Sequence, residues 1–340
     1  NMSVTSHNVS ELEEWLSRPT SQLEQDFSIL QGDLLILGAG GKMGPTLARM
    51  ARRALPAGSK VMAVSRFSSP AVVEQLEAEG IEVHRCDLLD RDAVTRLPDA
   101  AHVIYMAGQK FGTTNASERL WMMNAVMPSI VAKRYRNSRM VVFSTGCVYP
   151  FVDVQSGGSV ETDQLDPPGE YANSCIARER VFSFYCQEYD MPVLFFRLNY
   201  AIDLRYGVLR DIADKVWQQQ PIDVTMGHVN VIWQGDAYAR ALQCLKHAAS
   251  PPEVLNVTGA ETLSVRDLAH EFGSRLDREP IFTGEEASTA WLSNATKSIE
   301  WFGLPTVSLD QMLDATAAWV ERGGESLNKP THFQTRDGKY

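Results

Sequence analysis

Short apolar runs alternate with amphipathic segments from residue 33 to about residue 200. Each run is apolar at consecutive positions, which is typical of parallel strands buried on both faces of a sheet. The segments between the runs have the spacing of helices that cover such a sheet. We expect strands at 33–38, 60–65, 81–86, 102–108, 139–145 and 192–198. We expect helices at 44–55, 70–80, 92–97, 117–135 and 171–189.

The repeated strand–helix units predict an α/β fold with a doubly wound parallel sheet of the Rossmann type. After Asn199 the pattern changes to helices separated by short strand-like pieces, among them an apolar run at 254–259. The expected domains are an N-terminal helical extension at 1–32, a dinucleotide-binding domain at 33–200, a smaller C-terminal α/β substrate lobe at 201–325 and a polar tail at 326–340. The prediction includes possible crossings of the chain from the lobe back to the sheet.

The N-terminal extension contains two possible capping boxes. Ser10 precedes Glu13 by three residues, and Ser21 precedes Glu24 by the same spacing. In a capping box the serine side chain caps the helix N-terminus and the glutamate caps the serine in return. We therefore expect one or two short helices there, with a role in packing or dimer contact.

Composition limits the kinds of partner that this chain can bind. The 340 residues are 44% hydrophobic and 22% charged, as in ordinary globular domains. A net charge of −10 argues against general binding to nucleic acid or anionic membranes. No apolar run reaches the roughly 18 residues of a membrane span. The five cysteines are widely spaced and no metal-ligand spacing occurs, so we expect no disulfide framework, no metal site and a reduced, cytoplasmic protein.

A glycine-rich segment follows the first expected strand and precedes the first expected helix. Gly38, Gly41 and Gly44 stand at GxxGxxG spacing. Such a turn needs glycine backbone angles, and a pyrophosphate reaches the helix N-terminus only where no Cβ atom blocks it. A Walker loop is excluded, because Met43 follows Lys42 where that motif needs Ser or Thr. The segment predicts a dinucleotide-binding loop.

The end of the second expected strand bears on the choice of cofactor. An acidic residue there would accept the ribose 2′-hydroxyl of NAD, but Ser65 and Arg66 stand at this point. Without the carboxylate a 2′-phosphate is not repelled, and arginine can bind that phosphate in a fork. The pair favours NADP over NAD, although Arg66 can equally be a surface residue.

Further motifs follow the glycine loop in a fixed order. They are GAGGKMG at 38–44, CDLLD at 86–90, MAG at 106–108, FSTGCVYP at 143–150, EYANSC at 170–175 and RLNYAI at 197–202. Their order and spacing resemble those of the extended short-chain dehydrogenase/reductase superfamily, in its NAD(P)-dependent sugar epimerase/dehydratase branch. The resemblance covers roughly residues 33–322.

The resemblance implies hydride transfer at the nicotinamide of a bound cofactor. It implies that Tyr171 exchanges a proton with a substrate hydroxyl and that Thr145 hydrogen-bonds the same oxygen. It also implies a carbohydrate-type small molecule as substrate and a homodimer formed through long helices. Beside the glycine loop, the cofactor contacts that it implies are Asp87, Leu88, Met106, Ala107, Gly108, Asn124, Tyr171 and Asn199.

One departure from the family lies four residues after Tyr171, where Cys175 replaces the family's lysine. One helical turn separates the two positions, so they share a face. A unit charge about 5 Å away is worth roughly 3 kcal/mol at an effective dielectric near 20, or about two pKa units. Arg178 is the nearest candidate to supply that charge, and Lys110 and Lys42 are others. Cys175 is either a buried inert thiol or a reactive one activated near the helix N-terminus.

A second departure follows Thr145. The dehydratases of this branch have an acidic pair there, whereas this chain has Gly146 and Cys147. Neither residue can act as the acid or base of water elimination, so a dehydratase activity is disfavoured. Residues near and after the motifs are candidates for substrate contacts; they are Lys110, Cys147, Tyr200, Arg205, His228, Asn230, Trp233 and Gln234.

Two functions remain open from the sequence. The first is an NAD(P)-dependent oxidoreductase or epimerase that acts on a sugar or sugar-acid derivative with an atypical proton relay. The second is a catalytically impaired dinucleotide-binding sensor. Thr145 and Tyr171 favour the enzyme, and the missing lysine favours the sensor.

Overall fold

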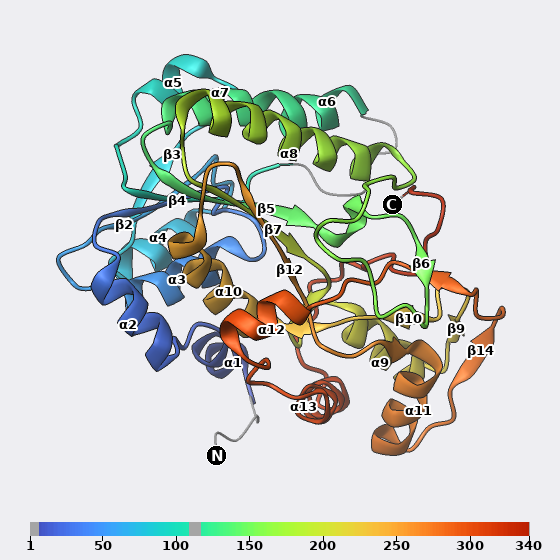
Figure 1. Cartoon of the computed structure of the whole chain (residues 1–340). Helices are drawn as coiled ribbons and strands as arrows, with labels where there is room; N and C mark the ends of the chain where they lie inside the picture. Colours follow the sequence, from blue (N-terminus) through green and yellow to red (C-terminus); the bar gives the residue numbers. More distant parts are fainter. Residues whose placement is uncertain (1–6, 109–116, 340) are drawn as a thin grey trace.

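The centre of the molecule is a parallel sheet of seven strands (Figure 1). The computed structural model describes residues 7–108 and 117–339. In spatial order the strands are β12 (Glu253–Val257), β7 (Val193–Leu198), β5 (Arg139–Thr145), β4 (His102–Tyr105), β1 (Leu34–Leu37), β2 (Val61–Ser65) and β3 (Glu82–Arg85). All neighbouring strands pair in parallel. The doubly wound sheet is therefore confirmed.

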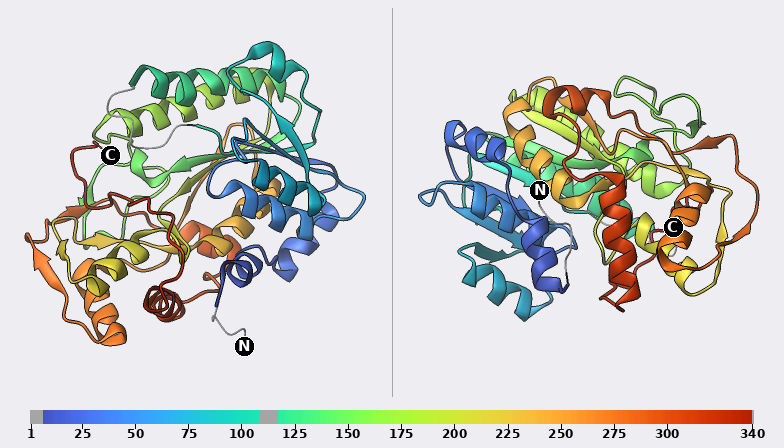
Figure 2. Two further views of the ribbon diagram at one scale, coloured as in Figure 1. Left: turned by 180° about the vertical axis from the view of Figure 1, so that it is seen from behind. Right: turned by 90° about the horizontal axis from the view of Figure 1, so that it is seen from below.

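A smaller lobe lies at the carboxyl ends of the strands (Figure 2). Its helices are α9 (Val208–Trp217), α11 (Val265–Leu276), α12 (Thr296–Phe302) and α13 (Leu309–Glu321). Its short strands pair as β6 (Val152–Asp153) with β15 (Thr289–Ala290), β8 (Ala201–Ile202) with β11 (Ile232–Trp233), β9 (Pro221–Asp223) with β14 (Ile281–Thr283), and β10 (His228–Val229) with β13 (Leu263–Ser264). The apolar run expected at 254–259 is β12, which leaves the lobe and pairs with β7 at the edge of the large sheet.

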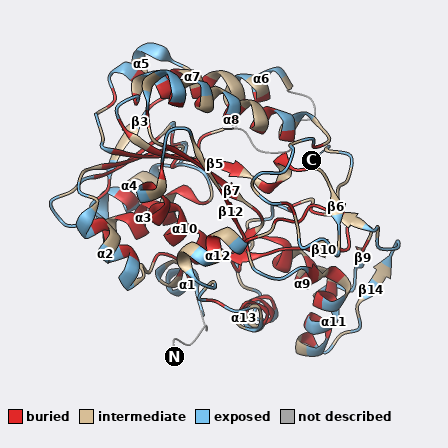
Figure 3. Ribbon diagram, in the orientation of Figure 1, coloured by how far each residue is buried: buried red, intermediate tan, exposed pale blue. Residues whose placement is uncertain are grey.

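Both faces of the sheet are covered, which explains the continuous apolar runs (Figure 3). Leu34 and Ile36 of β1 belong to the core on one face, and Leu35 and Leu37 belong to the core on the other. The helices on the first face are α3 (Gly44–Ala54), α4 (Pro70–Ala78) and α10 (Gln234–Gln243). Those on the second face are α5 (Arg91–Thr95), α6 (Ser117–Trp121), α7 (Met127–Arg134) and α8 (Glu170–Tyr189).

The helix expected at 117–135 contains a change of winding. Between α6 and α7 the chain forms one π-helical stretch, Met122–Val126, with Asn124 fully buried inside it. A π-helical stretch redirects side chains relative to a regular helix and is frequent at functional sites.

Two helices precede the sheet, α1 (Val9–Leu16) and α2 (Ser21–Ile29), and both pack on α3 and α10. The expected caps were wrong by one or two residues. The side chain of Asn8 caps α1 by accepting a hydrogen bond from Glu11 N, and Thr20 caps α2 through Leu23 N. Asn8 lies two residues before Ser10 and caps the helix there, so Ser10 falls inside α1. No helix in the described ranges is long and apolar enough to cross a membrane.

Candidate active site

The predicted glycine loop lies where β1 and β4 run side by side, at the carboxyl ends of the strands. Gly38 has φ +89°, and a Cβ atom on it would lie 2.5 Å from the backbone nitrogen of Ala107. A Cβ atom on Gly44, the first residue of α3, would lie 2.5 Å from Ala39 Cα. Sterics thus require glycine at both ends of this turn. Open parallel sheets bind ligands at such a point, where successive strands begin to be added on the other side of β1.

The loop borders a cavity of about 690 Å³, within the size range of cofactor sites, about 300–1,000 Å³. We call it the large cavity. Predicted cofactor residues that line it are Gly38, Gly41, Lys42, Met43, Ser65, Arg66, Asp87, Leu88, Met106, Ala107 and Gly108. Gly44, Asn124, Tyr171 and Asn199, also predicted as cofactor contacts, do not line it. Gly40, Cys86, Leu89, Arg119, Met123 and Met127 line it and were not predicted.

A smaller cavity of about 180 Å³ adjoins the large one, and Lys42, Met43 and residues 106–108 line both. We call it the small cavity. Tyr171, at the start of α8, and Thr145, at the end of β5, both line the small cavity. Thr145 Oγ1 accepts a hydrogen bond of 3.1 Å from Cys147 N. Tyr171, expected to exchange a proton with the substrate, and Thr145, expected to hydrogen-bond the same oxygen, thus lie around one space beside the large cavity.

Cys175 is fully buried below Tyr171 and lines neither cavity. Burial raises the pKa of the Cys175 thiol. A protonated, inaccessible thiol is a poor nucleophile, which favours the inert role over the reactive one.

Arg178 is the residue expected to supply a positive charge near Tyr171 in place of a lysine. It follows Tyr171 by two helical turns on α8, is 7% exposed and lines the small cavity. Its Nη1 donates a 3.0 Å hydrogen bond to Phe143 O, and its Nη2 donates one of 2.8 Å to Asn124 Oδ1. Among the described residues its Nε has no hydrogen-bond partner.

The backbone of Gly108 lies directly against this guanidinium. Gly108 has φ +140°, and a Cβ atom there would lie 2.5 Å from Arg178 Nη2 and 2.7 Å from Asn124 Oδ1. Only glycine allows Arg178 to approach the end of β4 so closely. The positive charge therefore lies at the boundary between the two cavities.

Asn124 links the helix that contains the π-helical stretch to α8. Its Oδ1 accepts from Arg178, and its Nδ2 donates a 3.0 Å hydrogen bond to Ser174 Oγ, which in turn donates to Tyr171 O at 2.6 Å. Asn124 thus acts on the site by positioning Arg178 and the first turn of α8.

Burial, and to a smaller extent the thiols of Cys175 and Cys147, raises the pKa of Tyr171 well above its ordinary value. The Arg178 guanidinium acts in the opposite direction and lowers this pKa. Tyr171 is therefore a neutral phenol at neutral pH, and Arg178 is a cation beside it.

Among the predicted substrate residues, Cys147 and Tyr200 line the small cavity, and so does Gln234. Asn199, predicted as a cofactor contact, lines it as well. Three polar residues that were not predicted also line it; they are Ser144, Tyr206 and Thr331. The Lys42 ammonium lies 3.3 Å from the centre of the Tyr206 ring.

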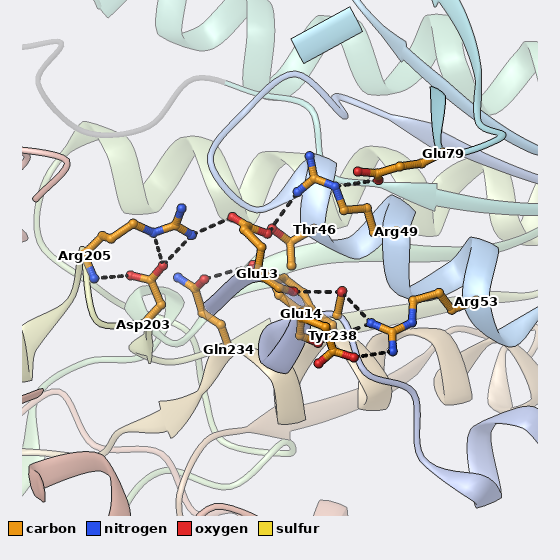
Figure 4. Close-up of polar contacts among 11 residues, drawn as sticks. Glu13, Glu14, Thr46, Arg49, Arg53, Glu79, Asp203, Arg205, Gln234 and Tyr238 are labelled. Atoms are coloured by element: carbon orange, nitrogen blue, oxygen red, sulfur yellow. Dashed lines mark hydrogen bonds and ion pairs between the residues drawn. The ribbon is translucent and has the colours of Figure 1, made fainter. Parts of the chain in front are cut away.

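Arg205 and Trp233 line neither cavity, because both side chains contact other parts of the chain. Arg205 Nε donates to Asp203 at 2.8 Å, and its Nη2 donates to Glu13 of α1 at 2.8 Å (Figure 4). Trp233 is 1% exposed and stacks on Trp15 of α1, with ring centres 4.1 Å apart. We leave both out of the proposed substrate site.

Three further predicted residues are not placed at the cavities. Asn230 accepts a 2.8 Å hydrogen bond from Ser293 N and donates to Glu261 O, so it holds loops of the lobe together. His228 lies on β10 and lines neither cavity. Lys110 lies outside the described residues. No cluster of three potential metal-binding side chains occurs within 7–108 and 117–339.

Known proteins share the sequence pattern and the fold. Residues 34–202, about half of the chain, match the NAD dependent epimerase/dehydratase family. No curated protein sequence matches the chain. UDP-glucose 4-epimerase of Thermotoga maritima, solved with UDP-glucose, has a TM-score of 0.70 at 16% identity, covering 86% of this chain and 99% of its own.

Two further solved structures have the same fold. UDP-glucuronic acid 4-epimerase of Bacillus cereus, solved with NAD, has a TM-score of 0.71 at 16% identity and covers 85% of this chain and 99% of its own. DesIV of Streptomyces venezuelae, a dTDP-glucose 4,6-dehydratase with NAD bound, has a TM-score of 0.72 at 18% identity, covering 85% and 97%. At these identities the likeness concerns the fold alone.

Proposed function

We propose a function from the premise that this chain belongs, through residues 34–202, to the NAD dependent epimerase/dehydratase family. The proposed protein is an NAD(P)-dependent oxidoreductase or epimerase that acts on a sugar or sugar-acid derivative. The observation that supports this most is the convergence of Tyr171, Thr145 and the buried Arg178 on the small cavity, which shares its border with the large cavity.

The residues of the large cavity fit a nicotinamide dinucleotide. The turn from Gly38 to Gly44 leaves no room for Cβ atoms at its ends, and nothing but Gly38 O lies within 4 Å of a Cβ atom at Gly41. The N-terminus of α3 favours negative charge, as a pyrophosphate requires. When bound, the nicotinamide would accept and return a hydride.

We propose NADP as the preferred dinucleotide, with NAD as the alternative. Ser65 and Arg66 both line the large cavity at the end of β2, and Arg66 is exposed there. No carboxylate stands at this strand end to accept a ribose 2′-hydroxyl or to repel a 2′-phosphate.

Tyr171 exchanges the proton of the substrate hydroxyl. In oxidation a phenolate at Tyr171 accepts that proton, and in reduction the neutral phenol returns it to the oxygen. Burial opposes the phenolate, and the adjacent Arg178 guanidinium stabilises it. Thr145 Oγ1 hydrogen-bonds the same substrate oxygen and orients it toward the phenol.

The small cavity favours oxidation, reduction or epimerisation over the elimination of water. Among the described residues that line it there is no Asp or Glu. Elimination needs a base and an acid beside the sugar, and no described carboxylate in this lining can serve as either. Cys147, Asn199 and Tyr200 are the proposed substrate contacts, together with Gln234.

The alternative is a dinucleotide-binding sensor without turnover, which the raised pKa of Tyr171 favours. A substrate screen separates the two functions. The protein is incubated with NADP or NAD and with free sugars, sugar acids, UDP-glucose and UDP-glucuronic acid. Nucleotide reduction is followed at 340 nm, and epimers are followed by NMR. Turnover of any of them supports the enzyme; dinucleotide binding without any turnover supports the sensor.

We also propose a homodimer formed through the helices on the second face of the sheet. Met122 and Phe184 are large apolar side chains that lie 45% and 60% exposed there. Met122 lies in the π-helical stretch and Phe184 in the neighbouring α8, so a dimer formed through these helices would cover both side chains. Light scattering on the unaltered protein and on Phe184→Glu tests this proposal. A monomeric unaltered protein would contradict it.

A further inference from the structure

The chain after α13 is a fixed segment, although it contains no helix or strand between residues 322 and 339. We call residues 322–339 the C-terminal strap. Its first part is held by Arg210, whose Nη1 donates a 3.0 Å hydrogen bond to Glu325 O, and by Arg205, whose carbonyl accepts from Leu327 N at 3.0 Å. The strap therefore begins anchored beside α9.

The middle of the strap is attached to α9 as well. The backbone nitrogen and the hydroxyl of Thr331 both donate to Asp211 Oδ2, at 3.0 and 2.7 Å. Phe333 is 5% exposed and belongs to the main hydrophobic core. These contacts fix the residues on either side of His332.

The end of the strap reaches the opposite side of the site. Arg336 donates two hydrogen bonds to Thr289, of 2.7 and 2.6 Å, and its guanidinium lies 4.4 Å from the Phe151 ring centre. Gly338 packs so tightly on Gly169 that a Cβ atom on it would lie 2.7 Å from Gly169 Cα. Gly169 directly precedes α8, so the strap passes from α9 to the start of the helix that contains Tyr171 (Figure 2).

Between these anchors the strap forms part of the wall of both cavities. Asn328, Lys329, Pro330 and His332 line the large cavity, and Thr331 lines the small one. The glycine loop, the strand ends and helices α6 and α7 form the remaining wall of the large cavity. A dinucleotide in this cavity would therefore touch the strap as well as the glycine loop.

The charges around the large cavity indicate what the strap would contact. Lys42, Arg66, Arg119 and Lys329 line the cavity, and among its described lining residues Asp87 alone carries a carboxylate. Lys42 already lies on the Tyr206 ring, whereas Lys329 forms no salt bridge within the described part of the chain. A lysine ammonium is a compact charge that binds phosphate well.

We propose that the C-terminal strap is part of the cofactor site, in which Lys329 binds a phosphate group of the dinucleotide and the strap slows release of the cofactor. This inference rests on the proposed function, because it requires a dinucleotide in the large cavity. It adds a segment that lies outside the part of the chain matched to the family.

Binding to the full chain tests the role of Lys329. NADPH and NADH fluorescence gives the dissociation constant and the release rate for the unaltered protein, Lys329→Ala and Lys339→Ala. Lys339 is the matched control, because it is an exposed lysine of the same strap that lines neither cavity. We expect roughly tenfold weaker binding for Lys329→Ala, with a weaker dependence on salt, and no change for Lys339→Ala.

The role of the strap in release is tested at a distance from the cavity. Arg336→Ala removes an anchor on Thr289 without changing the cavity lining. We expect the release rate of NADPH from this variant to be at least about three times that of the unaltered protein. In the unaltered protein, NADP should slow amide hydrogen exchange at Leu327 and Thr331, and adenosine alone should not.

The outcomes separate this inference from the proposed function. If the unaltered protein binds no dinucleotide, both are overturned. If the protein binds dinucleotide and Lys329→Ala binds it equally well, the Lys329 contact is overturned and the proposed function stands. Unchanged release from Arg336→Ala, with unchanged exchange in the strap, overturns the effect of the strap on release.

Discussion

The guanidinium of Arg178 donates a hydrogen bond of 2.8 Å to the side-chain oxygen of Asn124, and this contact fixes a buried cation beside Tyr171. The two residues lie on different helices, and the π-helical stretch turns Asn124 inward to meet Arg178. Cys175, four residues after Tyr171, carries no charge at the position where the sequence resemblance leads us to expect a lysine. Arg178, three residues further on, provides a positive charge in the lining of the small cavity.

Removing the charge of Arg178 should shift the pH dependence of turnover. In Arg178→Gln the pKa of Tyr171 rises, because the cation that lowers it is lost. The pH at which oxidation becomes fast should therefore increase, by up to about two units. Arg178→Lys should restore part of the shift, and Arg180→Gln, an exposed arginine of the same helix, should not shift the profile. Initial rates between pH 6 and pH 10 measure this, with melting curves to check folding; identical profiles would contradict it.

Tyr171→Phe should abolish turnover and preserve cofactor binding. Loss of a general acid–base group costs roughly 10²- to 10⁴-fold in rate, while the large cavity is unchanged. Tyr185→Phe is a suitable control, because Tyr185 is a partly buried tyrosine on the same helix that lines neither cavity. Steady-state rates and NADPH titrations give the two quantities, and turnover at the level of the unaltered protein would sink the role of Tyr171.

Arg66→Ala should weaken NADP binding more than NAD binding. Arg66 lines the large cavity at the end of β2, where we propose that the 2′-phosphate of NADP binds. Loss of a charge-assisted contact predicts roughly tenfold weaker NADP binding and little change for NAD. Arg91→Ala changes an exposed arginine outside the cavity and serves as control. Equal losses for both dinucleotides would argue against the NADP preference.

Alkylation of the cysteines should follow burial. Because burial raises the pKa of Cys175, its thiolate forms only above the ordinary pH range of thiols, and the side chain is inaccessible as well. Iodoacetamide at pH 8 should modify the partly exposed Cys147 and leave Cys175 unmodified in the native protein. Peptide mass spectrometry reads both sites, with urea-unfolded protein as control. Rapid native modification of Cys175 would contradict its inert role.

Glu13→Gln should destabilise the protein more than Glu14→Gln. Glu13 hydrogen-bonds Thr46 and pairs with Arg49 and Arg205, and it is 19% exposed (Figure 4). In Glu13→Gln these partly buried arginines lose a carboxylate partner. The free energy of unfolding should therefore fall by about 2 kcal/mol. The salt bridges of the 48% exposed Glu14 predict less than about 1 kcal/mol. Urea denaturation gives both values, and equal losses would contradict the ranking.

The sheet, the glycine loop and the convergence of Tyr171 with Thr145 could be predicted, because they depend on local patterns in fixed order. The substrate side was less predictable. Arg205 looks like a ligand-binding arginine in sequence, but its partner Glu13 lies 192 residues away. Trp233 is likewise explained by Trp15. The strap has no periodicity and binds through a few distant side chains, so no local signal indicated that it lines the large cavity.

The stacked pair of Trp15 and Trp233 has a practical consequence for anyone who shortens the chain. The match to the family begins at residue 34, and a boundary drawn there would remove α1 and α2. Four apolar side chains of these helices are at most 1% exposed and belong to the main core; they are Leu12, Leu16, Leu23 and Phe27. Their removal would uncover an apolar surface on α3 and α10, and such surfaces promote aggregation. The smallest piece that remains soluble should therefore begin before Asn8.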